Sequence, residues 1–436
     1  MRQEAPVYLQ VITVKTQADL DRVLSLLRSG SEFGGLARQH STHATAESEG
    51  LWGPTSPDEL PGEIRSRIRQ ADPGELIHFF HPALGYAILR KLDPPAAKQA
   101  LLRQSLNLGA WRLQRNEKDQ ALKELKKAVA LDPNSAAAHQ LLGQAYLAQG
   151  TYEMLGEAKS EFVQAIALDP DLVWARFYLA RIYLDLGLPR KAKEQLEAAL
   201  GIRPNVPHLL SLLGEAHRQL GDFDLAVERN RRALEADPSF YAANYYLGLA
   251  YLGLQKKAEA VRELETAAKS GPPVPDLYLT LGTIYAEQGD WERAIELFRR
   301  AATVAPERPE ARLKLGQAFR LKKMYDQALE ELKRAFPEGS RPLTTAHYQR
   351  LQADVFHEQG LVYQAKGASA QAIKNYTQAL EFDPDYGQTH RQLAEILFQQ
   401  GEYQRAKEHA LKAEKLKAPV EKSLFEQILQ KAGASR

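Results

Sequence analysis

Two pairs of histidines are the first residues whose types suggest chemistry. His40 and His43 are three positions apart, and so are His78 and His81. Imidazoles that meet can bind zinc or transfer protons. Neither pair has the i, i+4 spacing that places two imidazoles on one face of a helix, and no carboxylate is placed to orient them. We therefore expect ordinary surface or hydrogen-bonded histidines, with no metal site and no cofactor.

Other chemistries are excluded by composition. The 436 residues include no cysteine, which rules out disulfides, thiolate nucleophiles and Cys-based zinc sites. The sequence also contains no phosphate-binding glycine loop and no nucleophile elbow. Its 57 basic and 55 acidic side chains leave a net charge of +2, without the basic excess typical of nucleic-acid binding. No run approaches the roughly 18 apolar residues of a membrane helix, so we expect neither nucleic acid nor membrane insertion.

A second group of residues suits protein recognition better than catalysis. It combines aromatic, charged and apolar side chains: Trp174, Phe177, Arg181, Glu215, Arg218, Tyr245, Tyr246 and Leu249. Trp, Tyr and Arg are enriched among the residues that dominate binding energy at protein interfaces. The alternative interpretation is that some of these aromatic side chains only pack between neighbouring helices.

The elements that must position this group repeat every 34 residues. Pro170, Pro204, Pro238, Pro272 and Pro306 are spaced at that interval. Counting each Pro as position 32 gives nine units: 102–135, 136–172, 173–206, 207–240, 241–274, 275–308, 309–342, 353–386 and 387–420. Positions 20 and 27, which were not used to set this register, are Ala in all nine units.

Three irregularities interrupt the period. The second unit has three extra residues, which we expect at 152–156, between two helices. Residues 343–352 are an insertion, preceded by Ser340 where Pro is expected, and the helical pattern of 343–351 predicts an extended first helix in the following unit. After residue 420, the amphipathic pattern of 423–431 predicts a capping helix.

The repeat resembles the tetratricopeptide repeat, a pair of antiparallel helices. Small residues at positions 8, 20 and 27 let the helices approach closely, and large residues at 7, 11 and 24 fill the space between them. Such units stack into a superhelix with a concave surface. The resemblance implies that the eight residues above line this surface and bind a protein or peptide partner. Some family members clamp a peptide carboxylate with Lys at position 5, which this chain lacks throughout.

Residues 7–93 do not follow the period. Their patterns predict a small α+β domain, with strands at Val7–Val14 and Tyr86–Leu92 and helices at Ala18–Leu27, Phe33–His40 and Glu59–Arg69. We therefore expect a mostly α fold, a tetratricopeptide-repeat α-solenoid superhelix preceded by this domain. The predicted boundaries are 1–95 for the α+β domain, 96–420 for the repeats and 421–436 for the capping helix.

The N-terminal domain resembles a parvulin-type peptidyl-prolyl isomerase. The resemblance rests on ordered segments that span the domain: 13–16, 30–37 with Ser41, 50–53, 60–61, 73–75 and 84–88. It implies catalytic histidines at two positions where this chain has Val11 and Ala87, and a Cys or Asp where it has His43. A pocket without both imidazoles should catalyse isomerisation poorly. We expect it to bind proline-containing or apolar segments, with His40 or His43 as a possible substitute polar group.

The function that we expect is a non-enzymatic scaffold or chaperone-like adaptor. One alternative is an active prolyl isomerase whose repeats recruit protein substrates, and a second is a structural protein that self-assembles through its repeats. By analogy with the family, we expect an extracytoplasmic bacterial location with the targeting segment removed, the cytoplasm being the alternative.

Overall fold

The computed structural model describes residues 7–46, 49–55, 59–336 and 346–434. It divides into two compact units, residues 1–216 and 217–436, and the boundary falls within one helix.

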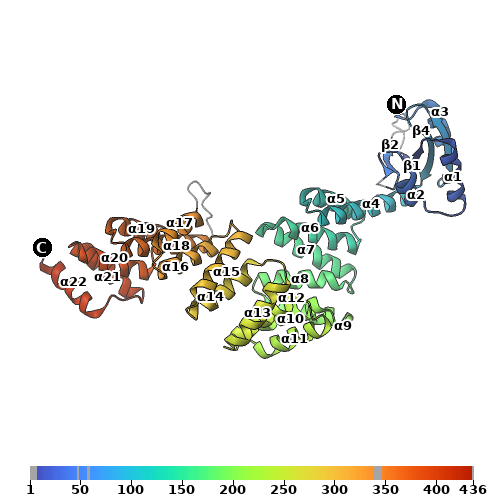
Figure 1. Cartoon of the computed structure of the whole chain (residues 1–436). Helices are drawn as coiled ribbons and strands as arrows, with labels where there is room; N and C mark the ends of the chain where they lie inside the picture. Colours follow the sequence, from blue (N-terminus) through green and yellow to red (C-terminus); the bar gives the residue numbers. More distant parts are fainter. Residues whose placement is uncertain (1–6, 47–48, 56–58, 337–345, 435–436) are drawn as a thin grey trace. The chain divides into compact units, whose positions relative to one another are not determined.

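The first unit begins with a four-stranded antiparallel sheet of order β2-β1-β4-β3 (Figure 1). Its elements are β1 (Val7–Val14), α1 (Gln17–Arg28), α2 (Phe33–His40), β2 (Leu51–Thr55), α3 (Gly62–Gln70), β3 (Leu76–His81) and β4 (Gly85–Leu92). Alternate residues of β1 face opposite sides of the sheet. Ile12 packs with α1 and α2, whereas Val11 packs with α3. The two helical layers therefore bury the central strand on both faces.

The predicted α+β domain is present, with two strands that the sequence analysis missed. β1 and α2 have the predicted bounds, but β2 contains Gly53 and Pro54, which disfavour a strand and are tolerated at a sheet edge. β3 is the other edge strand. The third helix begins at Gly62, three residues later than predicted, because Pro61 caps it.

The remainder of the chain is helical. The helices are α4 (Pro94–Gln114), α5 (Lys118–Leu131), α6 (Ala136–Gln149), α7 (Tyr152–Leu168), α8 (Val173–Asp185), α9 (Pro189–Ile202), α10 (Pro207–Leu220), α11 (Phe223–Ala236), α12 (Tyr241–Gly253), α13 (Lys257–Ser270), α14 (Pro275–Glu287), α15 (Trp291–Val304), α16 (Pro309–Leu321), α17 (Tyr325–Ala335), α18 (Ala346–Ala365), α19 (Ser369–Phe382), α20 (Gly387–Gln399), α21 (Tyr403–Lys415) and α22 (Lys422–Ala434). The predicted helical pairs are confirmed in all nine repeats.

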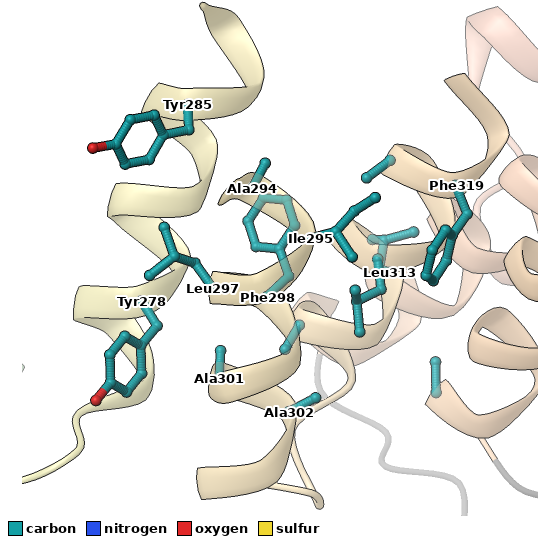
Figure 2. Close-up of a cluster of buried hydrophobic side chains, with 14 of the residues drawn as sticks. Tyr278, Tyr285, Ala294, Ile295, Leu297, Phe298, Ala301, Ala302, Leu313 and Phe319 are labelled. Atoms are coloured by element: carbon teal, nitrogen blue, oxygen red, sulfur yellow. The ribbon is translucent and has the colours of Figure 1, made fainter. Parts of the chain in front are cut away.

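The expected close approach of the two helices is visible at repeat position 8. A Cβ added at Gly282 would lie 2.6 Å from the Cε1 atom of Phe298, which occupies position 24 of the same repeat. Figure 2 shows Phe298 among the buried side chains, with Tyr278 and Tyr285 on the other side of α14. Five more glycines at position 8 face the position-24 side chain in the same way: Gly109, Gly143, Gly248, Gly316 and Gly360.

The turn between the two helices also repeats. Position 15 has a positive φ in all nine repeats, and six of these residues are glycine. Asn116, Gln255 and Lys323 adopt the same left-handed conformation with φ near 60°, which disfavours residues with a Cβ. The packing of each helical pair therefore imposes this turn even where the residue does not favour it.

The structure corrects one prediction about the irregular repeats and gives the bounds of the helix in another. The three extra residues of the second repeat do not form a loop, because α7 begins at Tyr152 and is 17 residues long. The extended helix predicted after the insertion is α18, of 20 residues, which begins at Ala346. Residues 343–345 and Ser340 lie outside the described residues.

The helix predicted after residue 420 is α22, which packs Ile428 against the last repeat.

The close approach at position 8 gives a stability prediction. Gly282→Ala should lower the free energy of unfolding by about 1–3 kcal/mol, because the buried Phe298 ring has little room to move. The matched control is Gly156→Ala in α7, where an added Cβ meets no atom within 4 Å. That change should stabilise by up to about 1 kcal/mol through helix propensity. Urea unfolding followed by circular dichroism distinguishes the two, and equal effects would contradict the packing argument.

Candidate binding surfaces

The first candidate surface lies in the N-terminal sheet. Val11 on β1 and Ala87 on β4 are fully buried. Val11 lies opposite Leu89, and Ala87 opposite Thr13. Because paired residues project from the same side of a sheet, all four side chains share one face. The two positions at which the resemblance implies imidazoles are therefore apolar, and Thr13 carries the hydroxyl group on this face.

Hydroxyl groups provide the polar contacts beside this apolar pair. The Oγ1 atoms of Thr13 and Thr42 are 2.9 Å apart. The Oγ atom of Ser41 accepts hydrogen bonds from the backbone N–H groups of Thr13 and His43, both at 3.1 Å. These contacts fix the chain that follows α2 against the centre of the sheet.

His43 is held in this segment as a neutral acceptor. Its Nδ1 atom accepts a hydrogen bond from the backbone N–H of Thr45 at 3.2 Å and lies 2.8 Å from the Thr45 Oγ1 atom. Burial lowers the pKa of His43 below its ordinary value, which favours the neutral imidazole. Its ring centroid lies 5.5 Å from that of Trp52 on β2. His43 therefore offers the Nε2–H group as a donor beside an aromatic ring.

The other histidines of the two sequence pairs are dispersed. His40 ends α2, while His78 and His81 lie on the edge strand β3. The Nδ1 atom of His81 accepts a hydrogen bond from the backbone N–H of Ala83 at 3.2 Å. Among the described residues, no group of three His, Cys, Asp or Glu side chains could hold a metal ion.

A buried carboxylate ties the N-terminal domain to the first helix of the array, within the first unit. Glu49 has a left-handed φ of 59° and lies between two guanidinium groups. Arg38 of α2 contacts it at 2.5 Å and Arg103 of α4 at 2.6 Å. Arg103 also pairs with Glu32 at 3.2 Å. Charge-assisted contacts of this kind are stronger than neutral ones, and they orient α4 against the domain.

The second candidate surface lies on helices α8 and α10 of the first unit. Trp174 is 37% exposed, and its ring centroid lies 5.5 Å from Phe177 and 5.7 Å from His208. Phe177 is partly buried against the core of this region. Arg181, one turn further along α8, lies over the Tyr178 ring at 5.4 Å. The three rings therefore form a rigid aromatic cluster, which we name the Trp174 cluster, with a cation nearby.

The other predicted partner residues are less accessible. Glu215 is only 7% exposed. In the second unit, Arg218, Tyr246 and Leu249 are half-buried, and Tyr245 packs against a hydrophobic core cluster. Packing between helices thus accounts for part of this group, and its role in partner binding remains a prediction.

A charged surface in the second unit was missed by the sequence analysis. Glu358 of α18 is 8% exposed. Its carboxylate accepts hydrogen bonds from Arg320 at 2.7 Å and Gln317 at 3.3 Å, both on α16. On helix α20, the guanidinium of Arg391 lies 3.9 Å from the carboxylate of Glu395. These residues occupy positions 5, 6, 9 and 12 of their repeats, where the first helices line the concave side. Different residue types in each repeat give no periodic signal, so only the predicted helix face could have suggested them.

Comparisons with known proteins agree with this architecture. Residues 211–275 and 279–340 match one family described as "Tetratricopeptide repeat", residues 152–216 match a second with that description, and residues 112–150 and 360–401 match the family "TPR repeat". Residues 12–93 match the family "PPIC-type PPIASE domain". Within the described residues, every helix is too short or too polar to cross a membrane.

Individual relatives resemble only part of the chain. Anaphase-promoting complex subunit 3 of Schizosaccharomyces pombe is 27% identical over 171 residues, or 39% of this chain and 25% of that protein. TPR repeat-containing protein YpiA of Bacillus subtilis is 27% identical over 150 residues, or 34% of each chain. The chain thus matches a quarter to a third of the length of these curated relatives.

Among solved structures, the APC/C hetero-tetramer Cut9-Hcn1 has a TM-score of 0.51 at 15% identity, covering 78% of this chain and 65% of that one. This likeness concerns the fold alone. Together with the matched families, the nine helical pairs and the N-terminal sheet show that the chain is a tetratricopeptide-repeat protein with an N-terminal parvulin-type (PPIC) domain.

Proposed function

We propose that this protein is an adaptor with chaperone-like character, which holds a partner segment on the first helices of its repeats. The single observation that carries the proposal is the Trp174 cluster. An exposed tryptophan that is fixed by two neighbouring rings offers a large contact area with little conformational entropy to lose. An extended or helical peptide with an apolar side chain fits such a surface.

The N-terminal domain acts, in this proposal, as an accessory binding module. Isomerisation must lower the barrier for rotation about the prolyl peptide bond, and the side chains of Val11 and Ala87 offer no polar group for that purpose. His43 and Trp52 remain beside this pair and suit a proline-containing or apolar segment. The same geometry supports the competing function, an active isomerase, only if the His43 imidazole replaces both missing groups.

The proposal is tested with the full chain in two measurements. A peptide array identifies bound segments, and their affinities are then measured for wild type, Trp174→Ala and Trp111→Ala. Trp111 is also exposed, at 48%, but lies at position 10 of the first repeat. Removal of an interface hot spot costs about 2 kcal/mol or more, so Trp174→Ala should weaken binding roughly 30-fold, whereas Trp111→Ala should leave it unchanged. Equal affinities for all three proteins would overturn the proposed surface.

The second measurement is NMR exchange spectroscopy of Xaa-Pro peptides with catalytic amounts of the protein. We expect shifted or broadened peptide signals without faster cis–trans exchange. Accelerated exchange that disappears in His43→Ala would instead establish the isomerase and contradict the accessory-binding proposal for this domain.

A further inference from the structure

Position 7 of the repeat holds a polar residue in only one unit. Eight repeats have Leu there: Leu108, Leu142, Leu179, Leu213, Leu247, Leu281, Leu315 and Leu393. The eighth repeat has Gln359 instead. This position packs between the two helices of a repeat, where a leucine contributes apolar contacts. A glutamine at the same place therefore needs a separate explanation.

The Gln359 residue is 8% exposed, and its amide forms no hydrogen bond with a described residue. The amide atoms are not enclosed, because neither belongs to the fully buried side-chain nitrogen and oxygen atoms that lack a hydrogen-bond partner. The amide therefore opens to solvent and can hydrogen-bond a molecule that lies beside it.

Gln359 lines a cavity of about 570 Å³ between α17, α18 and α19 of the second unit. The cavity lies where the period is interrupted, since α17 belongs to the seventh repeat and the other two helices to the eighth. Its wall is formed by Leu332, Lys333, Phe336, Val355, Phe356, Gln359, Tyr363, Gln371, Lys374, Asn375 and Gln378. A volume of this size is typical of small-molecule sites, which range from about 300 to 1,000 Å³.

This site is separate from the concave surface proposed above. None of its wall residues occupies positions 2, 5, 6, 9, 12 or 13 of a repeat, which line that surface. The rings of Phe336, Phe356 and Tyr363 instead belong to positions 28, 4 and 11. The inference therefore does not depend on the proposed partner binding.

The side chains in the cavity wall indicate which class of ligand the cavity would bind. Lys333 and Lys374 are exposed at the cavity and form no ion pair with a described residue. The wall includes no Asp or Glu, so an anion meets two cations and no opposing charge. Three aromatic rings accept an apolar body, and the Gln359 amide can donate to one oxygen and accept from a polar hydrogen. We propose that this cavity binds a small carboxylate with an aromatic or aliphatic body.

The test uses calorimetric titration of the full chain with 3-phenylpropionate, indole-3-acetate and hexanoate, each compared with its neutral primary amide. We expect at least one carboxylate to bind at least tenfold more tightly than its amide. Lys374→Gln should weaken that binding at least fivefold. The matched control is Lys123→Gln, which changes an exposed lysine at the same position 22 of the first repeat and should leave the affinity unchanged.

Gln359→Leu supplies a readout that does not depend on charge. It restores the residue of the other eight repeats, so the variant should fold, have a higher Tm without ligand and lose ligand binding. The proposal would be overturned if neither the free carboxylates nor the acidic tripeptide described below bind at concentrations up to millimolar. Binding that is unaffected by both Gln359→Leu and Lys374→Gln would overturn it as well.

The same carboxylate chemistry could reach the cavity as a free molecule or as an acidic side chain of a peptide. The second arm therefore titrates the N-acetylated, C-amidated tripeptide Ala-Glu-Phe and its Gln counterpart. Preference for the free acids assigns a small-molecule site, whereas preference for the acidic tripeptide assigns a peptide subsite. Both results support the proposal provided that Gln359→Leu abolishes the binding.

Discussion

Replacement of Arg320 by alanine is expected to lower the free energy of unfolding by about 3–5 kcal/mol. The reason is the carboxylate that the change leaves behind. The Glu358 side chain is 10% exposed, and the guanidinium of Arg320 contacts it at 2.7 Å. Among the described residues, its other hydrogen-bond partner is Gln317, at 3.3 Å. A neutral amide at that distance cannot compensate for a buried negative charge that has lost its counter-ion.

The matched control is Arg300→Ala in the same unit. Arg300 pairs with Glu296 at 2.6 Å, but both side chains are more than half exposed, and surface pairs contribute about 0–1 kcal/mol. Urea unfolding of the three proteins provides the comparison. Arg320→Ala combined with Glu358→Ala should recover part of the lost stability, because the uncompensated charge is then absent. Equal effects of the two single arginine changes would contradict the buried-pair interpretation.

The fold was predictable from the sequence where the same contact recurs. Gly282 and Phe298 represent a pair of positions that meets in six repeats, so six units show the same geometry. The strand β2 was not predictable in this way, because it occurs once and Gly53 and Pro54 conceal it. The start of α7 at Tyr152 was missed for a related reason: three added residues lengthen a helix as readily as a loop.

The sequence predicted which helices carry the candidate residues, but it did not predict how exposed each side chain is. The repeat register places Trp174 and Glu215 on equivalent helices, yet one is exposed and the other buried. Exposure depends on the size of neighbouring side chains from other repeats, which differ along the chain. Gln359 is an instructive case, because a comparison of position 7 across the nine repeats would have singled it out from the sequence. The empty space beside it required the structure.

The stability of the second unit is expected to fall as the pH decreases from 7 to 4, and the buried imidazole of His357 is one cause. The residue is 5% exposed. Its Nδ1 atom lies 2.9 Å from the Oγ1 atom of Thr389, and its ring centroid lies 4.9 Å from that of Tyr386. Burial, followed by the charges of Arg320, Arg350 and Arg391, lowers the pKa of His357 from 6.5 to about 4.

The sign of the effect follows from proton binding. Between pH 6.5 and about 4 the unfolded chain binds a proton at His357 and the native protein does not, so acid favours unfolding in this window. Each pKa unit corresponds to about 1.4 kcal/mol. The native protein should therefore lose about 3 kcal/mol of stability from this residue between pH 7 and pH 4. Burial lowers the pKa of His409 to about 4 as well, which acts in the same direction.

His357→Gln isolates the contribution, because Gln140 occupies the same position in the second repeat and glutamine carries no titratable group. Urea midpoints measured at intervals from pH 4 to pH 7 should show a shallower dependence for the variant, with the difference confined to pH values below about 6.5. His347→Gln, which changes an exposed histidine of the same helix, should retain the wild-type profile. Parallel profiles for wild type and His357→Gln would mean that the buried imidazole is protonated in the native protein, against the cationic side chains that surround it.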